Sequence, residues 1–218
     1  DGTLMAMMEE YHNATYSTIK RNSDFDYTLT ALLNQKESFP LDVLDSCKNL
    51  FSRRIKKNKQ WQQLDNYISN QREVVSRGLP QLTVQDSQNK KHSLKEAIKK
   101  SEYTFIDFWA SWCQPCIADI PELKKAYSKI DKEKLGFMSI SIDKDNAKWK
   151  ESNRAQQFSW PSLIDNTHEL EVQMGITYIP QGLIVDRDGK VVKRYVTKEG
   201  LYNFITEKGL LLESSHLK

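Results

Sequence analysis

The residues best suited to chemistry in this 218-residue chain are two cysteines, Cys113 and Cys116, in the stretch FIDFWASWCQPCIADIP, residues 105–121. A closely spaced cysteine pair can bind metal, form a structural disulfide or act as a reactive dithiol. A closed zinc site needs four Cys or His ligands, usually from two separated pairs. The chain has one CxxC pair, one further cysteine and four scattered histidines, so we expect no metal site.

A purely structural disulfide is also disfavoured. A bridge across CxxC closes a very short loop, so it restricts the unfolded chain little and adds little stability. At the N-terminus of a helix, however, free N–H groups and the helix dipole favour a thiolate at Cys113. Cys116 lies one turn further on, where it can resolve a mixed disulfide, and Pro115 suits the first turn because it needs no N–H. The spacing therefore favours a reactive dithiol at a solvent-facing helix tip.

Strand and helix patterns surround this pair. Residues 103–109 are rich in aromatic and β-branched residues and predict a buried strand, and the apolar spacing from Cys113 to Ile130 predicts a helix. The same patterns predict a hairpin near 82–90, strands over 135–142, 182–186 and 190–196, and helices over 93–100, 147–157, 170–174 and 198–208. This order indicates an α/β fold with a central mixed sheet flanked by helices.

The first part of the chain has a different pattern. Residues 1–75 contain one Gly and one Pro, and their apolar residues repeat at helical spacing. The three stripes are Leu4, Met8, Tyr11, Thr15 and Ile19; Leu41, Leu44, Cys47, Phe51 and Ile55, introduced by Pro40; and Trp61, Leu64 and Ile68. Composition changes at RGLP, residues 77–80. We predict a small all-helical region over 1–76 and an α/β domain over 77–218, and we interpret Cys47 as a small buried hydrophobe.

Composition and charge exclude several function classes. The net charge is +3, and the one concentrated basic run, residues 53–59, has no interleaved aromatic residues, so we expect no nucleic-acid partner. No apolar run approaches the roughly 18 residues of a membrane span. The chain begins at Asp1 without a basic-then-apolar leader, so we expect that any export signal has been removed.

The stretch DFWASWCQPC, Asp107 to Cys116, resembles the active-site segment of the thioredoxin superfamily. Pro121 matches a proline within that family's active-site helix, and Tyr178-Ile179-Pro180 resembles the loop whose cis-proline faces the dithiol. The resemblance covers about residues 79–209. The early hairpin and the segment at 162–174 resemble the TlpA/ResA-like (AhpC/TSA-type) thiol–disulfide oxidoreductases, some of which carry a helical segment ahead of this domain.

The resemblance also implies roles for individual residues. Asp107 matches a buried acid that exchanges a proton with Cys116, and Asp119 stands where ResA-like members have a glutamate. Gln114 differs from the thioredoxin glycine, so a redox potential does not carry over. Residues that would border a bound peptide are Trp112, Gln114, Pro115, Ile179 and Pro180, whereas Trp109 is assigned to the core.

We therefore predict a thioredoxin-like thiol–disulfide oxidoreductase that reduces protein disulfides, with Cys113 attacking and Cys116 resolving. We expect no cofactor besides the Cys113–Cys116 disulfide. The resemblance implies disulfide-containing client proteins, a membrane thiol relay as electron donor and a periplasmic or cell-envelope location. A disulfide oxidase or isomerase and a peptide-binding module stay open. A peroxidase is disfavoured because a single peroxidatic cysteine would not need this vicinal partner.

Overall fold

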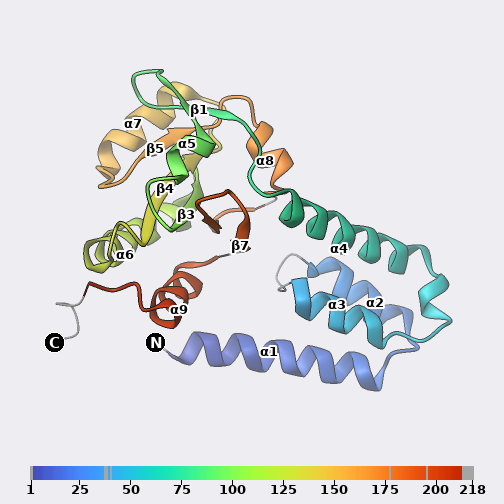
Figure 1. Cartoon of the computed structure of the whole chain (residues 1–218). Helices are drawn as coiled ribbons and strands as arrows, with labels where there is room; N and C mark the ends of the chain where they lie inside the picture. Colours follow the sequence, from blue (N-terminus) through green and yellow to red (C-terminus); the bar gives the residue numbers. More distant parts are fainter. Residues whose placement is uncertain (1, 37–38, 40, 177, 195, 213–218) are drawn as a thin grey trace. The chain divides into compact units, whose positions relative to one another are not determined.

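The computed structural model describes residues 2–36, 39, 41–176, 178–194 and 196–212. The chain divides into two compact units, Asp1–Glu73 and Val74–Lys218, which are described separately (Figure 1). This division falls within helix α4, a few residues before the boundary expected at residue 77. The assignment of two domains itself stays a prediction.

The first unit is helical, as the spacing predicts. It contains α1 (Gly2–Arg21), α2 (Asp26–Asn34), α3 (Leu41–Leu50), a 3-10 helix η2 (Ile55–Lys57) and most of α4 (Lys59–Arg77). Its core holds residues from all three predicted stripes: Ile19, Leu29, Leu32, Phe39, Leu44, Cys47, Phe51, Ile55, Leu64 and Ile68. Tyr11 departs from its stripe and is 45% exposed. The side chains of Leu4 and Met8, and all of Pro40, lie outside the described residues.

Cys47 is buried in this core, as predicted for a small hydrophobe. Burial raises the pKa of its thiol to about 11, because a thiolate loses its hydration in apolar surroundings. At neutral pH the thiol is therefore protonated and unreactive.

The second unit is built on a seven-stranded mixed sheet with the order β2-β1-β5-β4-β3-β6-β7. The strands are β1 (Thr83–Gln85), β2 (Lys91–Ser93), β3 (Tyr103–Trp109), β4 (Leu135–Ser141), β5 (Ser162–Ile164), β6 (Gln181–Asp186) and β7 (Val191–Lys193). Central strand β3 pairs parallel to β4 and antiparallel to β6. Strand β5 is absent from the sequence-based expectations, and β7 is shorter than expected.

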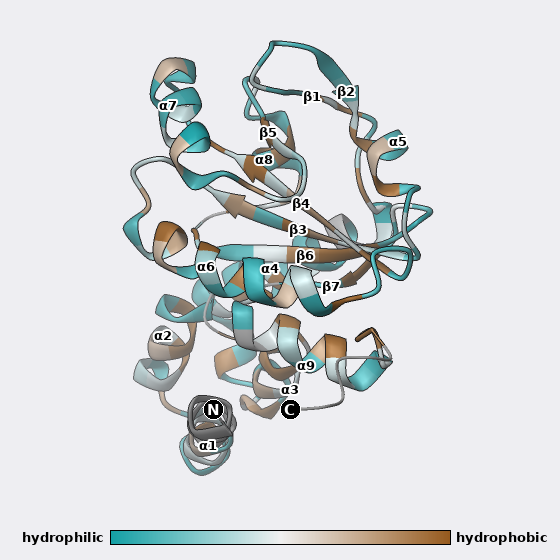
Figure 2. Cartoon of the chain, turned by 90° about the vertical axis from the view of Figure 1, so that its left-hand side faces the viewer, coloured by the Kyte–Doolittle hydropathy of each residue, from teal (hydrophilic) through white to brown (hydrophobic). Residues whose placement is uncertain are grey.

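Helices cover both faces of this sheet. They are α5 (Leu94–Ile98), α6 (Gln114–Lys129), α7 (Asn146–Gln156), α8 (Glu169–Gln173) and α9 (Lys198–Lys208). Alternate residues of β3 face opposite ways: Phe105 packs in a cluster with α6 and α9, and Ile106 in a cluster with α5 and α8. Hydrophobic stretches accordingly lie along the central strands, while the loop joining β1 and β2 is hydrophilic (Figure 2). No described helix combines the length and apolarity needed to cross a membrane.

Candidate active site

The cysteine pair lies where β3 passes into α6. Cys113 is the N-cap residue of α6, and its Sγ accepts a hydrogen bond from the backbone N–H of Cys116 at 3.2 Å. Cys113 and Cys116 form a disulfide. Pro115 stands in the first helical turn, and Pro121 lies inside the helix. The predicted strand-to-helix junction is present.

The predicted exposure of Cys113 is wrong for this disulfide form. Cys113 and Cys116 are each 4% exposed, because both sulfurs pack in an apolar cluster with Trp109 and Trp149. Trp112, the residue just before Cys113, is 63% exposed. Solvent therefore contacts the Trp112 side chain far more than either cysteine.

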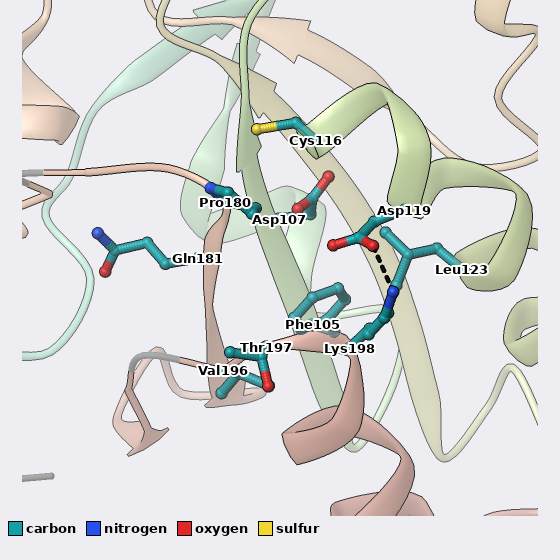
Figure 3. Close-up of a pocket in the computed structure, with 10 residues that line it drawn as sticks. All are labelled: Phe105, Asp107, Cys116, Asp119, Leu123, Pro180, Gln181, Val196, Thr197 and Lys198. Atoms are coloured by element: carbon teal, nitrogen blue, oxygen red, sulfur yellow. Dashed lines mark hydrogen bonds and ion pairs between the residues drawn. The ribbon is translucent and has the colours of Figure 1, made fainter. Parts of the chain in front are cut away.

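Asp107 lies beneath the dithiol in a cavity of about 270 Å³, which Cys116 also lines (Figure 3). Asp107 is 8% exposed. Burial raises its pKa to about 7; a hydrogen bond from Ser139 opposes this rise, and the negative charge of Asp119 adds to it. A carboxyl group with a pKa near neutrality can gain or lose a proton at physiological pH.

Asp119 lines the same cavity and is paired with Lys198, whose Nζ donates to its Oδ1 at 2.7 Å (Figure 3). The structure thus brings Asp119 to the cavity that holds Asp107. Lys198, at the start of α9, was missed by sequence reasoning. A lone lysine 79 positions from its partner gives no local signal.

The loop before β6 lies at the same cavity. The Ile179–Pro180 peptide bond is cis, and Pro180 lines the cavity beside Asp107. Ile179 instead lines a second cleft, of about 600 Å³, together with Trp112 and Tyr178. The buried Gln181 donates from Nε2 to the carbonyl of Tyr178, and it too was missed by sequence reasoning.

The remaining predicted peptide-binding residues are exposed at the start of α6. Gln114 and Pro115 border neither of these two spaces. Trp112 and Ile179 therefore line one cleft, whereas Pro180 lines the cavity that holds Asp107.

Asp143 ties the turn before the dithiol to the end of β4. Its Oδ2 accepts from the N–H of Ser111 at 2.8 Å and from the hydroxyl of Ser141 at 2.7 Å. Its Oδ1 accepts from the Ser111 hydroxyl at 2.7 Å. Asp143 therefore holds Ser111, two residues before Cys113, against the end of β4. Over the described part of the chain, no three His, Cys, Asp or Glu residues are grouped to hold a metal ion.

Comparison with known proteins agrees with this geometry. The family model described as AhpC/TSA family matches residues 75–194, more than half of the chain. The chain belongs to the AhpC/TSA family. This AhpC/TSA family member is 31% identical over 136 residues to a protein named thiol-disulfide oxidoreductase ResA from Bacillus thuringiensis, covering 60% of this chain and 76% of that protein. It is 27% identical over 143 residues to the ResA of Bacillus cereus, covering 64% and 82%.

Solved structures show the same architecture for the second unit of this AhpC/TSA family member. The thioredoxin domain of a thiol-disulfide oxidoreductase from Bacteroides vulgatus superposes with a TM-score of 0.54 at 23% identity, covering 60% of this chain and 94% of that one. The C-terminal domain of a thiol-disulfide oxidoreductase described as putative, from Bacteroides thetaiotaomicron, gives 0.53 at 26% identity, covering 60% and 92%. The predicted thioredoxin-like fold and the TlpA/ResA-like resemblance are confirmed.

Proposed function

We propose that this protein is a thiol–disulfide oxidoreductase that reduces disulfide bonds in client proteins. The observation that carries the proposal is the placement of Cys113 and Cys116 at the N-terminus of α6, with the buried carboxyl of Asp107 lining the same cavity as Cys116. The names of the ResA relatives support the same reaction class.

The reaction begins with the reduced protein. The Cys113 thiolate attacks one sulfur of a client disulfide, forming a mixed disulfide and releasing the other client sulfur as a thiolate. The N–H of Cys116, which points at the Cys113 sulfur, favours negative charge on that sulfur. The helix N-terminus adds to this effect.

Cys116 completes the exchange. Its thiol passes a proton to the Asp107 carboxylate, and the resulting thiolate attacks the sulfur of Cys113. The Cys113–Cys116 disulfide forms and the second client sulfur leaves as a thiolate, so two electrons have passed to the client. A pKa near 7 for Asp107 suits a group that must accept and then return a proton.

The client would lie along the exposed side of the dithiol. Trp112 and Ile179 line one cleft, and an extended peptide there could pair with backbone groups of the 178–180 loop. Because Cys113 is almost fully covered in the disulfide form, the electron donor that reduces the disulfide again can reach only the small open part of this sulfur.

The reductase direction, the electron donor and the location belong to the same proposal. We infer that a membrane thiol relay returns two electrons to the disulfide, and that the protein works in the periplasm or cell envelope, where clients with disulfides occur. No cofactor besides the disulfide is required by the exchange.

A trapping experiment tests this function. Reduced Cys116→Ser protein should accumulate a mixed disulfide with insulin through Cys113, whereas the matched Cys113→Ser variant should accumulate far less. Wild-type protein should reduce insulin when supplied with dithiothreitol. If neither trapping nor insulin reduction occurs, the fold serves peptide binding without redox turnover.

The potential of the dithiol decides the direction. Related dithiols range from about −270 mV for reductants to about −120 mV for strong oxidants. Equilibration with glutathione buffers should give a value toward the reducing end. A value near the oxidising end would contradict the reductase proposal and favour an oxidase.

A further inference from the structure

Asp107 is the last member of a buried hydrogen-bond chain. Trp160 Nε1 donates to the Ser139 hydroxyl oxygen at 2.9 Å, and that hydroxyl donates to Asp107 Oδ2 at 3.1 Å. All three side chains are buried. Ser139 and Asp107 are register partners on the parallel strands β4 and β3, so the sheet itself sets this contact.

The donors and acceptors of this hydrogen-bond chain can be arranged in only one direction. An indole N–H donates and cannot accept, whereas a hydroxyl has one hydrogen to donate. Because Trp160 already donates to the Ser139 oxygen, the hydroxyl hydrogen needs a different acceptor, and Asp107 is the side-chain acceptor that the described residues provide for it. The hydroxyl therefore points at Oδ2 whether or not Asp107 is protonated.

The donor at the far end is held rigidly. The Trp160 ring packs against Tyr127, Phe137 and Phe158 with centroid distances of 5.2, 5.3 and 5.4 Å. The backbone N–H of Ser139 also donates to the carbonyl of Pro161 at 2.9 Å. Backbone and side-chain contacts thus fix the indole N–H against the hydroxyl.

We propose that Trp160 and Ser139 are positioning residues that occupy Oδ2 of Asp107, so that Asp107 accepts and carries the exchanged proton on Oδ1. Within the described residues Oδ1 has no hydrogen-bond partner, and the Asp107 carboxylate borders the cavity that Cys116 lines (Figure 3). This inference rests on the proposed function, because it specifies how the acid of that reaction is held.

The same hydroxyl also stabilises the carboxylate. Removing it should raise the pKa of Asp107, because the ionised form loses its donor while burial still disfavours the charge. The charged and titratable groups facing Asp107 are Cys116 and Asp119 from α6 and Lys198 from α9, whereas Ser139 on β4 and Gln181 on β6 are neutral. In the oxidised protein Cys116 does not titrate, which leaves Asp107 to be followed alone beside the Asp119–Lys198 pair.

The test is a titration of Asp107 in the oxidised full-length chain, by the carboxyl ¹³C shift and assigned with Asp107→Asn. Ser139→Ala should raise the pKa by roughly one to two pH units, the size expected for losing a hydrogen bond to a buried charge. Trp160→Phe keeps an aromatic ring but removes the N–H, and should raise it less. The double variant should match Ser139→Ala, because Trp160 acts through Ser139.

Ser141→Ala is the matched control. Ser141 is equally buried on β4, two residues from Ser139, but its hydroxyl donates to Asp143. The inference is overturned if Ser139→Ala moves the pKa of Asp107 no more than Ser141→Ala does, or if the Ser139 and Trp160 effects simply add. Should Ser139→Ala not fold, Trp160→Phe alone decides, and an unchanged pKa would overturn the inference.

This titration needs no turnover, so it separates the inference from the proposed function. Shifted pKa values in a protein that never reduces insulin would leave the hydrogen-bond chain intact and refute the oxidoreductase. Insulin reduction by a protein in which Ser139→Ala leaves the pKa of Asp107 unchanged would support the oxidoreductase and refute the hydrogen-bond chain.

Discussion

The raised pKa of Asp107 makes the stability of the second unit depend on pH. The folded-state pKa is about 7 against an ordinary value of 3.8. Because the folded-state value is raised, this contribution to stability is fully present below the ordinary pKa and is lost as pH rises through the folded-state pKa. The total loss is about 4 kcal/mol, since one pKa unit corresponds to about 1.4 kcal/mol.

Asp107→Asn removes this titration. The amide oxygen can still accept from Ser139, so any packing change affects stability equally at all pH values. The free energy of unfolding of the variant, relative to wild type, should therefore rise by about 3 kcal/mol between about pH 5 and about pH 8. At the higher pH the stability of the variant relative to wild type is greatest, although the variant lacks the acid of the proposed reaction.

Amide hydrogen exchange in urea, read on peptides from β3 and β4, measures this quantity without the helical unit. The matched control is Asp188→Asn, which removes the same charge from the exposed turn between β6 and β7. A difference between Asp107→Asn and wild type that stays flat with pH would refute the raised pKa. If Asp188→Asn shows the same change of stability with pH, the lost net charge, and not the burial of Asp107, causes the effect.

Three further changes have expected outcomes. Lys198→Met should lower stability by less than about 1 kcal/mol, as for partly exposed ion pairs, yet raise the pKa of Asp107 in a ¹³C titration, because the charge of Asp119 then acts unopposed. Lys125→Met, which breaks an exposed ion pair on α6, the helix that carries Asp119, should leave that pKa unchanged. Asp143→Ala should cost about 3 kcal/mol in urea unfolding, since it leaves the part-buried donors of Ser111 and the buried hydroxyl of Ser141 without their acceptor. A loss no larger than that of a surface substitution would contradict this. Cys47 should react with Ellman's reagent only after unfolding, and rapid labelling of the native oxidised protein would show that it is accessible.

The sequence predicted those strands and helices whose own residues show the pattern typical of the element. Strand β3 matches its predicted bounds, Tyr103–Trp109, because a run that is aromatic or β-branched at every position except Asp107 is typical of a buried strand. Helix α9 also matches, Lys198–Lys208, with Thr197 as its cap. Strand β5 has three residues, too few for any periodicity, so only its pairing with β4 and β1 defines it.

The site was predictable where its residues form a local motif or where the resemblance supplied them, as it did for Pro180. Cys113 and Cys116 form a local motif, whereas Ser139 and Trp160 reach Asp107 through strand register and aromatic packing. A weak signal did exist: Ser139 and Ser141 alternate along an otherwise apolar strand, which indicates polar partners on one face. The identity of that partner could not be predicted, because the register of β3 against β4 is a property of the folded sheet.

The two sulfurs of the dithiol thus have opposite electrostatic surroundings. Cys113 caps a helix and receives an N–H, so negative charge on it is favoured in the reduced state. Cys116 faces the cavity of Asp107, where an ionised carboxylate opposes a second negative charge. In the proposed reaction, Cys116 therefore keeps its proton until Asp107 accepts it, and Cys113 attacks first. The order of the two steps follows from where β3 and α6 place a carboxyl group and an amide.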